Sequence, residues 1–202
     1  MMFNITSITA LIIAASFAGG LNIYATVLTL GILTRFHLAL LPPGLESLGH
    51  TWVLVACATL FAVEFVADKI PGFDLVWNAI HTLIRIPIAA LLAYHASAQL
   101  SPQMQILATV IGASIALIAH SSKTAIRAAV TPSPEPLSNI ALSSTEDLFA
   151  VILTWIATQH PILAAATALT FLLVMLIAVR KLIRAIRSRL NTLFAPNPSK
   201  AH

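Results

Sequence analysis

Charged residues are scarce in this sequence. Asp, Glu, Lys and Arg make up 9% of its 202 residues, whereas hydrophobic residues make up 58%. A soluble domain carries about a quarter charged residues and needs them to cover a surface that faces water. The hydrophobic residues also stand in long unbroken runs rather than alternating with polar ones. The composition therefore excludes an ordinary soluble domain and predicts an integral membrane protein whose surface faces lipid.

Cysteine and the common catalytic motifs are lacking as well. Cys57 is the single cysteine, so neither an intrachain disulfide nor a cysteine-based metal cluster can form. No two histidines have the i, i+4 spacing of a metal site on one helix, and there is no His-Glu-x-x-His motif. A Gly-x-Ser-x-Gly nucleophile elbow and a glycine-rich phosphate loop are missing too. We therefore expect no metal site, no cofactor and no enzymatic activity.

Six apolar stretches run along the chain, most of them near the roughly 20 residues that a membrane-spanning helix needs. The first lacks the basic residues that open a signal peptide, so we interpret it as a retained span. The third follows a polar helical stretch from Asp74 to Arg85, and Pro87 should kink it. The sequence predicts one integral membrane domain over residues 1–194, an all-α polytopic bundle of about six transmembrane helices. The predicted spans are residues 5–33, 51–67, 86–98, 104–130, 144–158 and 161–179.

Basic residues gather at the C-terminal end of the last span, which is typical of the cytoplasmic side of a membrane. With six spans, the N-terminus would lie on that side too. We therefore predict a multi-pass protein of the cell inner (plasma) membrane with both termini cytoplasmic. A basic cytoplasmic helix should cover residues 180–194 and a disordered tail residues 195–202. The cluster comprises Arg180, Lys181, Arg184, Arg187, Arg189 and Lys200.

The basic cluster also bears on the partners of the protein. It accounts for much of the net charge of +4, so we do not expect nucleic acid as a partner. Its charges suit anionic lipid head groups. The expected partner is therefore the lipid bilayer, with anionic head groups at the basic helix. A small ion or solute fits as a ligand, and the sequence leaves open whether the protein forms a homo-oligomer.

The two halves of the chain show a faint similarity of organisation. In each, a long span leads into a proline-bearing loop, at residues 41–48 and 133–140, and then into a shorter span. Three spans in each half would make the halves face opposite ways, as inverted repeats do in many transporters. Because little identity joins the halves, duplication of residues 5–100 as 103–179 remains a hypothesis.

The first span contains a candidate interruption. Gly19 and Gly20 lie near its middle, where a break would fall, and Asn22 follows them. The small residues suit close packing of helices better than a break that binds a ligand. Asn22 is the more suggestive residue, since a buried amide requires partners.

Ionisable residues inside the predicted spans are costly unless they are paired or hydrated. Here they form three stripes with helical spacing and complementary sign. Glu64 and Asp68 share one helix face, a mixed stripe precedes the third span, and a positive stripe lies in the fourth. Such stripes could line a buried polar cavity that binds an ion or a small solute. The candidate binding residues are Asn22, Glu64, Asp68, Asp74, His81, Arg85, His120, Lys123 and Arg127.

A structural interpretation competes with the functional one. Salt bridges near the interfaces, or basic side chains that snorkel to the head groups, would explain the stripes without a binding site. Asp74 could simply cap a helix. Ser143 and Glu146 have the capping-box spacing, and Asp147 would favour the positive end of the same helix, so we assign both acids a structural role.

Several motifs resemble an uncharacterised family of small membrane proteins catalogued as domain of unknown function 4126 (DUF4126). The most specific is Glu64-Phe65-Val66-Ala67-Asp68-Lys69-Ile70-Pro71-Gly72-Phe73-Asp74, and Ser121-Ser122 is a departure because we expect a smaller residue there. The resemblance implies an integral membrane protein and assigns no activity. Further matching motifs are Gly20-Leu21-Asn22-Ile23-Tyr24-Ala25, Leu41-Pro42-Pro43-Gly44-Leu45-Glu46, Trp77, Ile80-His81-Thr82, Arg85, Ala119-His120, Lys123, Ser133-Pro134-Glu135-Pro136-Leu137-Ser138-Asn139 and Glu146-Asp147.

Two hypotheses for the function follow from these observations. The leading one is a small transporter or channel for an ion or small solute, with a buried cavity of paired acidic and basic residues. The alternative is a membrane protein that transports nothing, either a scaffold or a lipid-binding subunit of a larger assembly. The three charged stripes favour the first hypothesis, and the basic C-terminal helix favours the second.

Overall fold

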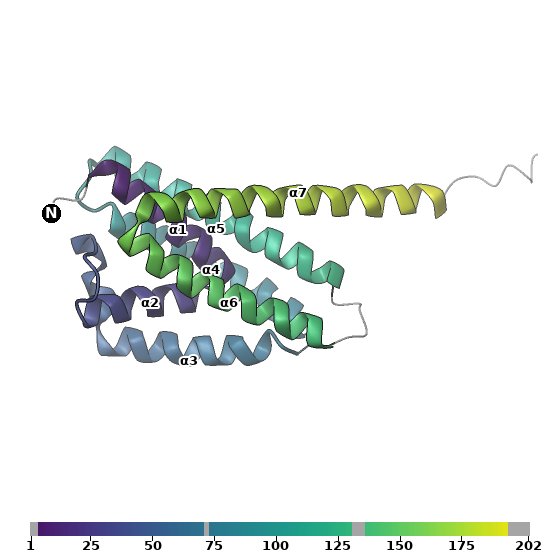
Figure 1. The fold of residues 1–202 in the computed structure, drawn as a ribbon, viewed down its shortest axis with the longest axis horizontal. Coiled ribbons are helices and arrows are strands. Elements are labelled where there is room, and N and C mark those ends of the chain that lie inside the picture. The colour runs from purple at the N-terminus through teal and green to yellow at the C-terminus, as the bar shows by residue number, and fades with distance from the viewer. Residues whose placement is uncertain (1–3, 71–72, 131–135, 194–202) are drawn as a thin grey trace, which may run out of the picture.

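The computed structural model describes residues 4–70, 73–130 and 136–193, and these residues form helices and no strand. Figure 1 shows most of the helices running along one common direction. The prediction of an all-α fold is confirmed. The helices are α1 (Ile5–Leu21), α2 (Ile23–Arg35), the 3-10 helix η1 (Pro43–Gly49), α3 (Thr51–Ala67), α4 (Phe73–Ala96), α5 (Pro102–Val130), α6 (Pro136–Gln159) and α7 (Pro161–Leu193).

Four of these helices are long and apolar enough to cross a membrane. A fifth crossing results if η1 and α3, which meet at a bend of 69°, are taken as one span. The observed number is thus close to the predicted six, and the helices agree with an integral membrane protein. The four long segments are Val76–Ala96, Pro102–Ala129, Ile140–Gln159 and Pro161–Asn191.

The first predicted span, residues 5–33, is interrupted at Asn22. The backbone of Asn22 is extended (φ −148°, ψ 104°), and its side-chain Oδ1 accepts a hydrogen bond from the Ala25 amide at 2.9 Å, which caps the start of α2. After this break α2 turns back along α1, since Leu30 lines the same small cavity as Leu11 and Ala15. The 17 residues of α1 and the 13 of α2 extend about 25 and 20 Å, less than the roughly 30 Å hydrocarbon core. The pair therefore forms a helical hairpin, and neither of its helices is as long as that core.

The hairpin changes the expected topology. Figure 1 shows that α1 starts at one end of the bundle and that α7 ends beyond the opposite end. The prediction that both termini are cytoplasmic depended on a single crossing by residues 5–33. The chain instead returns after Asn22 to the end from which α1 came, so residues 5–33 do not supply that single crossing, and the side on which each terminus lies stays a prediction.

Helix α1 occupies the centre of the bundle. It packs against α4, α5, α6 and α7, and most of its residues are buried. Gly20 permits this approach, because a Cβ there would lie 2.7 Å from both the Ala116 carbonyl oxygen and the Ala119 Cβ. Small residues allow such close contact between helices in membranes. The predicted packing role of this glycine agrees with its surroundings, and the break falls two residues later.

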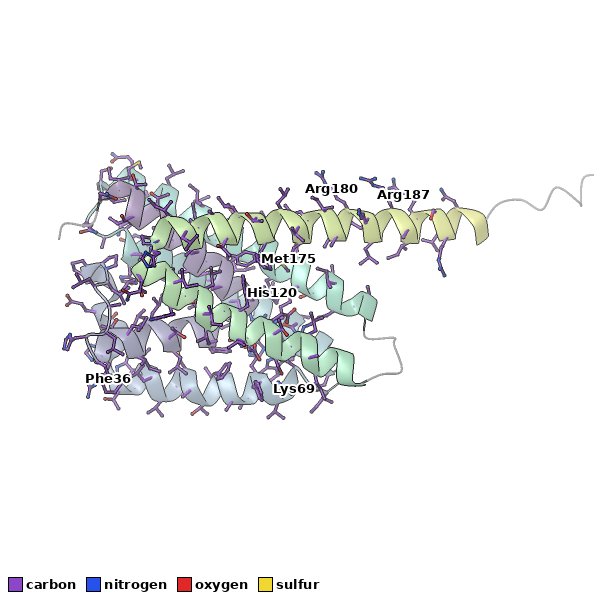
Figure 2. The ribbon with its side chains drawn as sticks, in the orientation of Figure 1. Phe36, Lys69, His120, Met175, Arg180 and Arg187 are labelled. Carbon is purple, nitrogen blue, oxygen red and sulfur yellow. The ribbon has the colours of Figure 1, made fainter. Side chains whose placement is uncertain are left out.

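Helix α7 extends beyond the rest of the bundle (Figure 1). Its 33 residues correspond to about 50 Å, well beyond the hydrocarbon thickness. The predicted basic helix is thus the continuation of α7, and Figure 2 shows Arg180 and Arg187 on it. The predicted tail at residues 195–202 lies outside the described residues. The inverted repeat and the single-domain boundaries remain predictions.

Candidate functional site

Polar side chains from five parts of the fold meet beside the break at Asn22. They come from the end of α3, from α4, α5 and α6, and from the hairpin itself. Nearly all are fully buried, and Figure 2 shows His120 inside the bundle. We call this set the ionic network: Asn22, Glu64, Asp68, Asn78, Arg85, His120, Lys123, Arg127, Glu146 and Asp147.

Arg85 organises one half of the network. Its Nη2 donates to Glu64 Oε1, and both side chains are fully buried. Its Nη1 donates to Asn78 Oδ1 at 2.9 Å and to His120 Nδ1 at 2.8 Å. Helical spacing on α4 places Asn78 two turns before Arg85, so both point to the same side. Three helices are thereby joined through one guanidinium.

The contacts of His120 fix its tautomer. Arginine can only donate, so His120 Nδ1 must accept from Arg85 and carries no proton. The proton is then on Nε2, which donates to Thr82 Oγ1 at 2.7 Å and to the Asn78 carbonyl oxygen at 3.2 Å. Thr82 Oγ1 can accept because its own proton goes to the Asn78 carbonyl oxygen. His120 is therefore neutral in this arrangement.

Lys123 and Arg127 organise the other half. They lie one turn apart on α5 and face two acids from different helices. Arg127 Nη2 lies 3.1 Å from Asp68 Oδ2 and 2.6 Å from Glu146 Oε2. Lys123 Nζ lies 3.4 Å from Asp68 Oδ2 and 3.3 Å from Glu146 Oε2. The acidic and basic stripes predicted from spacing do meet, as the charge complementarity indicated.

The network also holds the broken ends of the hairpin. Lys123 Nζ donates to the Leu21 carbonyl oxygen at 2.7 Å, which would otherwise be an unpaired C-terminal carbonyl of α1. Asn22 Nδ2 donates to Asp147 Oδ1 at 2.8 Å. The break in the chain and the buried charges are therefore one connected structure.

The structural interpretation of Glu146 and Asp147 as helix-cap residues is wrong. Helix α6 begins at Pro136, so Ser143 and both acids lie inside it rather than at its start. Ser143 Oγ has no hydrogen-bond partner and caps nothing. Glu146 instead pairs with the α5 cations, and Asp147 with Asn22. Sequence reasoning missed these acids as site residues because it placed the start of the helix too late.

Two predicted binding residues, His81 and Asp74, are not among the residues of the ionic network described above. His81 lies beside the network: its Nδ1 donates to the Trp77 carbonyl oxygen at 2.9 Å, and its ring stacks on Trp77 and meets Tyr24 edge-on. The side chain of Asp74 is outside the described part of the structure, so its proposed role stays a prediction. Asn78, which is not among the predicted binding residues, links Asp68 to Arg85.

Tyr24 lines a cavity of about 360 Å³ that neither Arg85 nor Glu64 lines. It is lined by α2, η1, α3 and α4, and it extends from Tyr24 to Trp52 and His95 near the end of the bundle where α4 stops. Its volume is within the range of sites for small molecules. A second, more open groove of about 790 Å³ between α3 and α4 is lined by Thr59, Trp77 and otherwise apolar residues.

Comparison with known proteins gives a family and no activity. No curated protein and no solved structure shows a significant match to the chain. A protein-family model described as "Domain of unknown function (DUF4126)" matches residues 9–181, which include the hairpin apart from the first residues of α1 and the whole ionic network. The chain therefore belongs to the DUF4126 family, as the motifs around Glu64 and Asp68 indicated.

Proposed function

We propose that the protein moves a small ion or solute across the membrane and that the ionic network is its binding site. The observation that carries the proposal is the helix break at Asn22, whose two ends are held by Lys123 and Asp147. Non-helical backbone is tolerated at membrane depth only where protein or a polar cavity satisfies it. Transporters place interrupted helices at their binding sites for this reason.

Burial of so many charges supports the same proposal. Ionisable side chains inside a membrane are expensive and tend to mark the paths of ions and protons. A purely structural role would be served as well by apolar packing, since replacing a buried ion pair with apolar residues is often neutral or stabilising. The network contains three cations and four acids rather than a single pair. Such a concentration of charge favours a functional role.

The cavity beside Tyr24 supports the proposal. Its lining includes Tyr24, which contacts His81 edge-on, and also Ser47 of η1 and His95 near the end of α4. In our proposal the aromatic pair separates the cavity from the network in this conformation. Movement of α2, which carries Tyr24 directly after the break, would connect them.

We infer the orientation of the protein in the membrane from the basic extension of α7. Under the positive-inside rule this end is cytoplasmic, and Lys69, which Figure 2 shows near the end of α3, lies at the same end. The start of α1 is then on the opposite side of the plasma membrane. The network lies nearer the cytoplasmic end and the Tyr24 cavity opens toward the other side.

Recording charge movement tests the proposal. Purified protein in liposomes on a solid-supported membrane would be exposed to jumps in pH, Na⁺, K⁺ and small anions. We expect a transient from the wild type and from Glu46→Gln, an exposed acid in η1, and a strongly reduced one from Glu146→Gln. These substitutions are chemically identical, so the network position is the only difference. Transients of equal size from Glu46→Gln and Glu146→Gln would refute the proposal. The absence of a transient from every folded protein would refute it as well.

One observation favours the second candidate function, a lipid-binding or scaffold protein. The extension of α7 exposes Arg180, Lys181, Arg184 and Arg187, of which the first lie nearest the bundle. Basic residues next to a span attract anionic lipids by about 1 kcal/mol each. If the liposomes are electrically silent while anionic lipid still co-purifies with the protein, this function is the better supported one.

A further inference from the structure

Charge does not balance within the described part of the network. Four carboxylates, Glu64, Asp68, Glu146 and Asp147, face three cations, and the hydrogen bonds of His120 make it neutral. Arg85 is engaged by Glu64. Lys123 and Arg127 are shared by Asp68 and Glu146. One carboxylate is therefore left without a cation of its own, and that carboxylate is Asp147.

The hydrogen bonds of Asp147 have the pattern of a neutral carboxyl group. Its Oδ1 accepts from Asn22 Nδ2, and the orientation of that amide is fixed because Asn22 Oδ1 accepts from the Ala25 amide. Its Oδ2 is buried without a hydrogen-bond partner. Ser143 Oγ, one turn earlier on the same face of α6, is also buried without one. Asp147 Oδ2 and Ser143 Oγ form no hydrogen bond with each other in this arrangement. Because they lie one turn apart on one helix face, rotation of either side chain would let Ser143 Oγ accept a proton that Oδ2 carries.

Charged groups on the neighbouring elements do not supply the missing cation. Lys123 on α5 donates to the Leu21 carbonyl oxygen and to Asp68 Oδ2, and it forms an ion pair with Glu146. Lys69, after α3, donates to the Phe65 carbonyl oxygen and lies over the Phe65 ring. Asp68 and Glu146 add negative charge, and the buried residues of α7 are apolar. The opposed ends of α1 and α2 meet at Asn22, so their partial charges largely offset each other.

We propose that Asp147 is the exchangeable proton-binding residue of this protein, and hence that the transported or coupling ion is the proton. The inference rests on the proposed transport function and specifies its ion. A metal cation would need a shell of several oxygen ligands, whereas Asp147 Oδ2 and Ser143 Oγ are the two buried oxygens on this face of α6 without partners. A proton needs only one carboxylate oxygen to bind and one acceptor to orient it.

The position of Asp147 connects its proton to the hairpin. When the proton leaves, the new negative charge would attract Lys123, which holds the Leu21 carbonyl oxygen just before Asn22, the hydrogen-bond partner of Asp147. Lys123 would then give up one of its present partners, which include the carbonyl that ends α1. Release of Leu21 frees the break at Asn22 and, with it, α2 and Tyr24. In this proposal, proton loss from Asp147 and movement of α2 are linked through the Lys123 side chain.

Infrared difference spectroscopy on protein in nanodiscs tests the inference without requiring transport. We expect wild-type protein to show the carbonyl stretch of one buried protonated carboxyl group, which disappears as the medium is made alkaline. Asp147→Asn should lack that signal and Glu46→Gln should keep it. Ser143→Ala should keep it with a shifted frequency, because the acceptor of the carboxyl proton is gone. Exchange of Na⁺ for K⁺ at constant pH should change nothing.

Three results would overturn the inference: no such signal in the wild type, the same signal in Asp147→Asn, or its loss on adding Na⁺ at constant pH. The second would place the proton elsewhere, with Glu64 as the first alternative, since its Oε2 is also unpartnered. Failure of the two proposals is distinguishable. A proton on Asp147 without charge movement would reject transport alone, and charge movement that is unaffected in Asp147→Asn would reject the assignment of Asp147 alone.

Discussion

Two identical substitutions at different points of the network should have very different effects on stability. Asp68→Asn and Asp147→Asn each replace a carboxylate by an amide of the same shape. The Asp68 carboxylate faces Lys123 and Arg127, both of them fully buried. Asp147 contacts only the neutral Asn22 amide among its described side-chain partners.

The expected magnitudes follow from what each variant leaves behind. Without the charge of Asp68, Lys123 and Arg127 keep Glu146 as their carboxylate partner among the described ion pairs. Removing one partner of a buried ion pair costs about 3–5 kcal/mol. In Asp147→Asn the amide oxygen still accepts from Asn22, and its NH₂ can donate to Ser143, as the proton does in our proposal. No ion pair is lost, so the free energy of unfolding should change by less than about 1 kcal/mol.

Equilibrium unfolding in mixed micelles, followed by the loss of helical circular dichroism, measures both variants beside the wild type. Glu46→Gln reports the effect of the same chemical change at an exposed site. If Asp147→Asn loses as much stability as Asp68→Asn, Asp147 is ionised in the native protein and the reasoning fails. If Asp68→Asn loses almost nothing, the network does not hold its helices together.

Three further predictions concern the hairpin and its packing. Asn22→Ala removes a helix cap and the partner of Asp147, so the protein should lose about 1–2 kcal/mol of stability and most of its charge movement. Asn4→Ala removes the exposed cap of α1 and should lower stability alone. Equal charge movement in both variants would contradict a role for Asn22. Gly20→Ala should lower the free energy of unfolding by about 1–3 kcal/mol, because its Cβ would meet the α5 backbone. Gly49→Ala should lower it less, because its Cβ would meet the end of the Thr34 side chain. If thermal unfolding ranks the two variants the other way, the close packing of Gly20 against α5 is contradicted. In a Cys57→Ala background, Asn4→Cys and Ser188→Cys should react with a membrane-impermeant maleimide from opposite sides of the membrane. Labelling of both cysteines from the same side would contradict a hairpin that does not cross the membrane.

The convergence of the charged stripes was predictable from the sequence. Glu64 and Asp68 lie one helical turn apart in apolar surroundings, and so do Lys123 and Arg127. Charges in such surroundings must find partners, and the two pairs have opposite sign. The spacing therefore identified which residues meet, although it could not specify that Asp68 is shared by both cations or that Asn78 bridges to Arg85.

The hairpin and the role of Asp147 were not predictable in the same way. Residues 5–33 are apolar throughout, and whether they cross once or turn back depends on the conformation of the single residue Asn22. The capping-box spacing of Ser143 and Glu146 suggested the start of a helix, but α6 begins at Pro136 and carries both into its interior. Local patterns cannot distinguish these alternatives, because tertiary contacts to α5 and to the hairpin decide them.

The most direct test of proton movement through the network is the response of reconstituted protein to a pH jump. In liposomes on a solid-supported membrane, with Na⁺ and K⁺ held constant, wild-type protein and Glu46→Gln should give a transient whose sign reverses with the direction of the jump. Asp147→Asn, folded and inserted to the same level, should give none. A transient of equal size in Asp147→Asn, or one that requires Na⁺ or K⁺, would contradict proton movement through Asp147.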